Sequence, residues 1–238
     1  MTVLVSRPSP NHDERDPRTR LDMLLLHYTG MKTAAEALAR LTDPAAKVSA
    51  HYTLDEDGTL YAHVPEELRA WHAGQSSWGG QSDINSRSIG IEIVNPGHDW
   101  GYRAFPEPQI ARLIALSREI VARHAIPPER VLGHSDVAPA RKQDPGELFP
   151  WERLAAAGLG LWPHAVGSAS AVGADASSER ILALQSKLSR IGYGLDATGL
   201  YDEPTRLVVT AFQRHFRRRS VTGEADAETV ALIEALAR

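Results

Sequence analysis

The sequence predicts an α/β (α+β) fold, in which a mixed β-sheet is flanked by helices, followed by a small all-α domain of three helices. Residues 1–163 alternate short apolar segments with amphipathic ones, a pattern typical of a sheet covered by helices. Residues 164–177 are almost all small, which indicates a flexible linker. Residues 178–238 then show only helical periodicity. We therefore expect two domains joined by a linker.

Four segments of the first domain predict strands. Residues 22–30 contain the apolar run MLLL before a turn, which favours a buried strand. Residues 48–64 alternate on both sides of the turn Asp55–Gly58, which predicts a hairpin. Residues 88–95 have apolar side chains at alternate positions, and residues 130–134 form a last short strand.

Five segments predict helices. In the first domain these are residues 33–41 and 107–126, the second with a clear apolar face. In the tail they are residues 178–193, 202–216 and 226–237. The last two each open with an Asp, whose carboxylate can accept a hydrogen bond from a first-turn N–H.

The composition excludes several classes of protein. The chain has 238 residues, 42% hydrophobic and 24% charged, which is ordinary for a globular protein that buries a core. A net charge of −4 gives no general attraction to nucleic acid, so no nucleic-acid partner is expected. There is no cysteine, which excludes disulfides and thiolate metal sites.

The N-terminal twenty residues are too polar for a signal peptide, and without cysteine there is no lipid-attachment motif. No apolar run is long enough for a membrane span. We therefore expect a soluble chain, cytoplasmic by default.

Two histidines and an aspartate form a candidate metal site. His27 and His134 end predicted strands, and Asp144 follows in a proline-rich loop. The ends of neighbouring strands converge at one edge of a sheet, so the three side chains can meet. Two imidazoles and a carboxylate would hold one Zn²⁺ and leave its fourth position for water, which the ion would activate.

Amide hydrolysis needs a proton carrier and a cation as well. Glu92 interrupts an apolar strand, where an acid is unfavourable unless it has a partner or a task. Lys142, two residues before Asp144, could stabilise the negative oxygen of the tetrahedral intermediate. A structural alternative stays open, in which Glu92 pairs with Arg87. Singly, each residue is better explained by a structural role, whereas the combination favours a zinc hydrolase.

The fragments LLLHYTG, AWHAG, NSRSIGIEIVN and GHSDVAPARKQDPG occur in this order between about Leu21 and Leu154. Together they resemble the zinc-dependent N-acetylmuramoyl-L-alanine amidases of the Amidase_2 family, which are related to peptidoglycan recognition proteins. The resemblance implies zinc ligands at His27, His134 and Asp144, and catalytic roles for Glu92 and Lys142. It implies hydrolysis of the amide between N-acetylmuramic acid and L-alanine of the stem peptide, in peptidoglycan or in muropeptides.

Other polar residues fall in or near these motifs. His51, Trp71 and His72 are interpreted as pocket residues that contact substrate, with His51 also a candidate outer partner of a ligand. Asn85 and Arg87 could contact peptide carboxylates. Asp136 lies too close to His134 for the matched pattern, so we expect it to support the loop.

The tail resembles the three-helix peptidoglycan-binding module, on cues that include Gly192-Tyr193, Phe212-Gln213 and residues 222–226. The resemblance implies a peptidoglycan partner and suggests the cell envelope. The tail would hold the enzyme on the wall while the linker lets it search nearby bonds. The basic run RHFRRRS, residues 214–220, is expected to be solvated. We expect a monomer.

Three alternatives remain. A peptidoglycan-recognition protein on this fold would bind without hydrolysis, although it would lack a zinc ligand that this chain retains. A phage-type lysin would use the same chemistry. A cytosolic recycling amidase would prefer small anhydromuropeptides and gain nothing from the tail.

Overall fold

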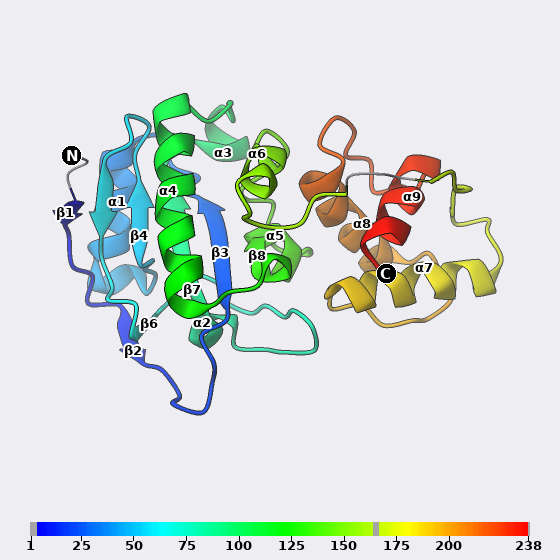
Figure 1. Ribbon diagram of the computed structural model, residues 1–238, viewed down its shortest axis with the longest axis horizontal. Coiled ribbons are helices and arrows are strands. Elements are labelled where there is room, and N and C mark those ends of the chain that lie inside the picture. Colours follow the sequence, from blue (N-terminus) through cyan, green and yellow to red (C-terminus); the bar gives the residue numbers. More distant parts are fainter. Residues whose placement is uncertain (1–3, 164–166, 238) are drawn as a thin grey trace.

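The computed structural model describes residues 4–163 and 167–237 (Figure 1). Its centre is a six-stranded mixed sheet of order β1-β5-β4-β7-β3-β8. These strands are β1 (Leu4–Ser6), β3 (Met23–Tyr28), β4 (Tyr52–Leu54), β5 (Leu60–Ala62), β7 (Ser88–Ile93) and β8 (Val131–Gly133). A separate antiparallel pair is formed by β2 (His12–Glu14) and β6 (Leu68–Ala70).

The helices of the described residues surround this sheet and form the tail. They are α1 (Ala34–Thr42), α2 (Ile84–Arg87), α3 (Gly97–Trp100), α4 (Glu107–His124), α5 (His134–Val137), α6 (Trp151–Ala156), α7 (Ser178–Ile191), α8 (Glu203–Phe216) and α9 (Ala227–Leu236). The mixed α/β fold and the three-helix tail are confirmed. His134 begins α5 rather than ending a strand, because the chain turns into a helix directly after Gly133.

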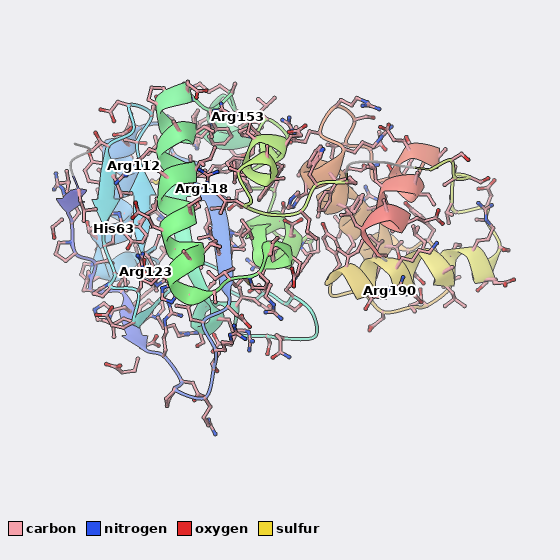
Figure 2. The ribbon with its side chains drawn as sticks, in the orientation of Figure 1. His63, Arg112, Arg118, Arg123, Arg153 and Arg190 are labelled. Atoms are coloured by element: carbon pink, nitrogen blue, oxygen red, sulfur yellow. The ribbon has the colours of Figure 1, made fainter. Side chains whose placement is uncertain are left out.

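The long helix α4 covers one face of the sheet (Figure 1). It shares a core cluster with the central strands, whose members include Leu24, Leu26, Ile89, Ile91, Leu113 and Ile120. Polar residues of α4 lie away from this cluster, among them Arg112, Arg118 and Arg123, which Figure 2 labels. The predicted amphipathic pattern of α4 is therefore confirmed.

Alternation along the two central strands sends polar side chains to the opposite face. In β3, Leu24 and Leu26 face α4, so His27 points to the other side. In β7 the isoleucines face α4, so Glu92 points to the same side as His27. The two strands are parallel, and their register pairs His27 with Glu92. This face of the sheet therefore brings together two residues predicted to do chemistry.

The tail packs against the first domain and is not held at a distance from it. A second core cluster combines residues of both parts, among them Met23, Leu25, Trp78, Leu184, Phe212 and Ile233. Residues 164–166 of the expected linker lie outside the described residues. Further along the linker, Val172 is 4% exposed and donates its N–H to the carbonyl of Ala225 at 2.8 Å. The domain boundaries themselves stay a prediction.

The expectation that the basic run 214–220 is solvated is wrong. His215 is buried, and the Arg217 guanidinium pairs with the carboxylates of Asp226 and Glu228 at 2.5 and 2.9 Å. Arg218 pairs with Glu152 of α6 at 2.6 Å. Composition could not show these pairs, because it does not reveal which acidic residues folding brings close to the run, such as Glu152, which is 66 residues away in the chain.

Of the helices within residues 4–163 and 167–237, none is both long and apolar enough to cross a bilayer.

Gln109 of α4 links the helix to the sheet. It is fully buried, and its amide nitrogen donates to the carbonyls of Leu54 and Val94 at 3.0 and 2.9 Å. Gln109→Leu would leave two buried carbonyls without this donor, so we expect the free energy of unfolding to fall by about 1–3 kcal/mol. Urea unfolding measures this change. The exposed Glu119→Gln on the same helix should change it by less than about 0.5 kcal/mol; equal effects would refute the role of Gln109.

Candidate active site

Three buried side chains converge on one point beyond the ends of β3 and β8. His27 is the last buried residue of β3, His134 begins α5, and Asp144 follows in the loop. The Nδ1 atoms of the two histidines lie 2.9 Å apart, and each lies 3.1 Å from Oδ2 of Asp144. The three residues are 1%, 3% and 6% exposed. These atoms form a candidate metal site among the residues described.

The spacing of the three atoms fits a small cation with tetrahedral coordination. Ligand atoms about 2.0–2.1 Å from one shared Zn²⁺ would lie roughly 3.3 Å from each other. The observed separations of 2.9–3.1 Å are close to that value. The donor set of two imidazoles and one carboxylate is also one that Zn²⁺ accepts.

The hydrogen bonds around His134 assign its tautomer. Its Nε2 lies 3.0 Å from the carbonyl oxygen of Ala73, which can only accept. Nε2 therefore carries the proton, and Nδ1 presents its lone pair towards His27 and Asp144. An outer partner of this kind orients a metal-binding imidazole.

A longer chain of hydrogen bonds assigns His27 in the same way. The Ser88 hydroxyl donates to the carbonyl of Ile84 at 2.6 Å, so its oxygen accepts from Nε2 of His72 at 3.3 Å. Nδ1 of His72 is then an acceptor, and it lies 3.0 Å from Nε2 of His27. Nε2 of His27 donates this bond, which leaves the lone pair of Nδ1 pointing at the candidate metal position.

Burial keeps these groups in the forms that bind a cation. Burial, and then the proximity of His134, lowers the pKa of His27 to about 4, so its ring is neutral at pH 7. Burial alone would raise the pKa of Asp144, but His134 and His27 outweigh it and hold the pKa below its ordinary value. A neutral imidazole and an ionised carboxylate are the forms that a metal requires.

Glu92 faces the same cavity without a visible partner. Its Oε2 is buried and has no hydrogen bond from the residues that the structure describes. Burial raises the pKa of Glu92 well above its ordinary value, Asp144 adds to the rise, and Lys142 opposes it. The alternative ion pair with Arg87 does not form, because Arg87 binds Asp22 at 2.8 Å. Glu92 is thus a carboxyl group suited to carry a proton.

The site opens into a cavity of about 490 Å³. Its lining contains all five predicted metal and catalytic residues, and also Trp71, His72, Arg40 and Lys47. Trp71 and His72 thus line the cavity, and their contact with substrate stays a prediction. His72 is nevertheless mostly buried beneath His27, where it acts as the outer partner of that ring.

Three predicted substrate contacts have other roles in the structure. His51 is fully buried, does not line the cavity, and accepts the N–H of Gly90 at its Nδ1 at 2.9 Å. Its Nε2 lies 3.1 Å from the carbonyl of Leu68. His51 therefore holds the backbone of β7 at Gly90, and it contacts neither the cavity nor a ligand atom directly.

Asn85 and Arg87 are likewise absent from the cavity lining. The side-chain oxygen of Asn85 accepts the N–H groups of His72 and Ala73 at 3.0 and 2.8 Å, so it holds the backbone of the AWHAG motif. Arg87 is held by its ion pair with Asp22. Loop polarity in the sequence could not separate these internal contacts from substrate contacts.

Sequence reasoning missed two residues of β7. Ser88 orients His72, and Gly90 makes room for it, because a Cβ at position 90 would lie 2.5 Å from Cγ of His72. The signal was present in the strand SIGIEI. Its isoleucines alternate with Ser88, Gly90 and Glu92, which places two small residues beside the acid on one face.

Comparison with known proteins follows the two parts of the chain. The Amidase_2 family, described as N-acetylmuramoyl-L-alanine amidase, matches residues 17–147. The PG_binding_1 family of peptidoglycan binding domains matches residues 177–233.

One relative matches both parts of the chain and another matches the first part alone. The N-acetylmuramoyl-L-alanine amidase AmiD of Escherichia coli is 40% identical over 236 residues, which span 91% of this chain and 82% of AmiD. The E. coli 1,6-anhydro-N-acetylmuramyl-L-alanine amidase AmpD is 34% identical over 164 residues, which span 62% of this chain and 87% of AmpD.

A solved complex of E. coli AmiD with anhydro-N-acetylmuramic acid-L-Ala-D-γ-Glu-L-Lys superposes with a TM-score of 0.78 at 37% identity, covering 94% of this chain and 91% of AmiD. The family match over more than half of the chain, the relatives and the buried His-His-Asp group agree, so this chain is a member of the Amidase_2 family of N-acetylmuramoyl-L-alanine amidases.

Proposed function

We propose that this chain hydrolyses the amide between N-acetylmuramic acid and L-alanine of peptidoglycan, with one Zn²⁺ held by His27, His134 and Asp144. The observation that carries the proposal is the convergence of three ligand atoms within 3.1 Å near Glu92, whose buried Oε2 has no hydrogen bond from the part of the chain that the structure describes. Zinc, when bound, supplies Lewis acidity and lowers the pKa of a coordinated water to about 7.

Glu92 is proposed to carry the proton. It would accept a proton from the attacking water and deliver it to the leaving amide nitrogen, so that the stem peptide departs as a free amine. Its position beside His27 on the parallel strands keeps it at the cavity. Burial and then Asp144 raise the pKa of Glu92, whereas the Lys142 charge opposes this rise and so favours the ionised form needed for the first step.

Lys142 is proposed to stabilise the oxygen that becomes negative in the tetrahedral intermediate. It lines the cavity together with Asp144, and its ammonium is a compact charge suited to an oxyanion. Arg40 and Lys47 line the same cavity from α1 and the turn that follows it. We propose that their charges favour the anionic stem peptide over a neutral amide.

The tail is proposed to bind the wall polymer. Its family match supports a polymeric substrate, whereas AmpD, which aligns with 62% of the chain, is named for a 1,6-anhydro compound. Assays on insoluble peptidoglycan and on a soluble anhydromuropeptide, with products identified by mass, test the bond and the preference. Release of stem peptide from neither substrate would contradict the proposal and favour a recognition protein.

Removing the metal should abolish hydrolysis. Dialysis against a chelator should reduce the release of stem peptide to background, because the three ligands alone cannot activate water. Addition of one equivalent of Zn²⁺ should restore it, while Mg²⁺, which prefers oxygen ligands, should not. Metal content measured beside activity checks the stoichiometry. Full turnover after complete metal removal would exclude a zinc mechanism.

Glu92→Gln should separate metal binding from turnover. The variant keeps the shape of the side chain but cannot accept a proton, so we expect kcat to fall by about 10²-fold or more. Zinc content should stay at that of the unchanged chain. Glu119→Gln, on the exposed side of α4, is the matched control and should keep full activity. If Glu92→Gln retains kcat, another group carries the proton.

Gly90→Ala should weaken the metal site through His72. The added methyl group would displace the His72 ring, and with it the outer partner of His27, so we expect a loss of metal affinity of about 10–100-fold. Competition with a chelating dye measures this affinity. Gly167→Ala adds the same methyl group where, apart from its chain neighbours, no described residue lies within 4 Å, and it should leave affinity unchanged. Equal affinities for the two variants would show that His72 does not support the site.

A further inference from the structure

The tail contacts the segment that carries three of the proposed active-site residues. His134, Lys142 and Asp144 all belong to residues 134–152, which run through α5, an irregular loop and the start of α6. In Figure 1, α8 of the tail lies beside α5 and α6. The metal loop, defined as residues 134–152, therefore lies between the central sheet and the tail.

Asp136 is the centre of this contact. The residue is 1% exposed, and Oδ2 accepts the N–H of Gly133 at 2.8 Å. The hydroxyl of Tyr193 donates to Oδ1 at 2.8 Å, and Nδ1 of His215 lies 2.8 Å from Oδ2. Two of these three hydrogen bonds come from the tail. A buried carboxylate is destabilising unless such donors surround it.

The position of Asp136 affects the positions of both ligands in this segment, His134 and Asp144. Asp136 lies two residues after the ligand His134 in the short helix α5, and it fixes Gly133, the residue before that ligand. Gly133 is closely packed, because a Cβ there would lie 2.7 Å from Cδ of Pro145, the neighbour of Asp144. The N–H of Ser135 donates to the carbonyl of Asp144 at 2.9 Å. A shift of Asp136 would therefore move His134 relative to Asp144.

Other contacts hold the same segment. The His215 ring stacks on Trp151 of α6, with centroids 3.8 Å apart. The Arg214 guanidinium donates to the side chain of Gln143 at 3.3 Å, between Lys142 and Asp144 in the chain. Arg218 donates to the carbonyl of Glu147 at 3.1 Å. The tail thus contacts the metal loop on both sides of Asp144.

We infer that Tyr193 and His215 are positioning residues for the amidase reaction, which hold Asp136 and so keep His134 and Asp144 at the spacing that a metal needs. This role rests on the proposed zinc chemistry and is separate from wall binding. It makes the tail a structural part of the active site, required even for a small soluble substrate.

Tyr193→Phe in the full-length chain tests the inference. It removes one donor to Asp136 and keeps the ring, which packs against Trp78 with centroids 4.9 Å apart. Tyr201→Phe is the matched control, because within residues 4–163 and 167–237 the Tyr201 hydroxyl forms hydrogen bonds only in the tail, with Gly223 and Ala225 at 3.0 and 2.9 Å. The rate at which zinc passes to a chromophoric chelator is measured for each zinc-loaded protein. Tyr193→Phe should release zinc roughly tenfold faster, and Tyr201→Phe at the unchanged rate.

Two further measurements separate positioning from binding. On a soluble anhydromuropeptide, Tyr193→Phe should lower kcat several-fold and leave KM unchanged, because a displaced ligand affects the reacting centre. Sedimentation with insoluble peptidoglycan should retain as much Tyr193→Phe as unchanged protein. A raised KM with unchanged kcat would make Tyr193 a substrate-binding residue and overturn the inference.

The decisive result is the release of zinc. If Tyr193→Phe and Tyr201→Phe release zinc at the same rate, the tail does not position the ligands and the inference is overturned. This comparison can be read even if the unchanged protein cleaves no muropeptide, an outcome that would instead overturn the proposed function.

Discussion

The close approach of three electron-pair donors in a buried place is the constraint on which the rest of the structure depends. Two imidazole nitrogens and a carboxylate oxygen lie 2.9–3.1 Å apart, largely out of contact with water. Such a group is favourable when a cation is shared between its members, because burial removes the water that would otherwise solvate them. The hydrogen bonds at Nε2 of His27 and of His134 leave the Nδ1 lone pairs of both rings pointing towards the candidate metal position.

The two parallel strands β3 and β7 satisfy this constraint by alternation. In β7 the isoleucines face α4, and Ser88, Gly90 and Glu92 face the site. In β3, Leu24 and Leu26 face α4, whereas His27 lies on the site face, where Met23 and Leu25 pack in the cluster shared with the tail. The same register that brings Glu92 opposite His27 also leaves, at Gly90, the space that the His72 ring occupies. The six-residue strand β7 thus provides the proposed proton carrier Glu92, the space for the His72 ring and the hydroxyl of Ser88 that orients this ring.

The tail packs against the first domain, whereas a tethered module would be joined to it only through the linker. A common apolar cluster and the buried carboxylate of Asp136 join the tail to the domain that carries the site. Because the tail is attached in this way, the cavity has a fixed position relative to the surface of the tail. The basic run 214–220, which composition alone assigns to solvent, supplies much of this attachment.

The sequence by itself determined the mixed sheet, the hairpin, the long amphipathic helix and the three tail helices, because these depend on local periodicity, turn residues and helix caps. It also singled out His27, Glu92, His134, Lys142 and Asp144, because in combination they suit a zinc hydrolase and because they lie in motifs that resemble the amidase family. Tertiary structure alone decided that His51, Asn85 and Arg87 bind inside the protein, and that His215 meets Asp136. The physical reason is that a polar side chain is satisfied by whichever partner folding brings within about 3 Å, and for these residues that partner is remote in the chain.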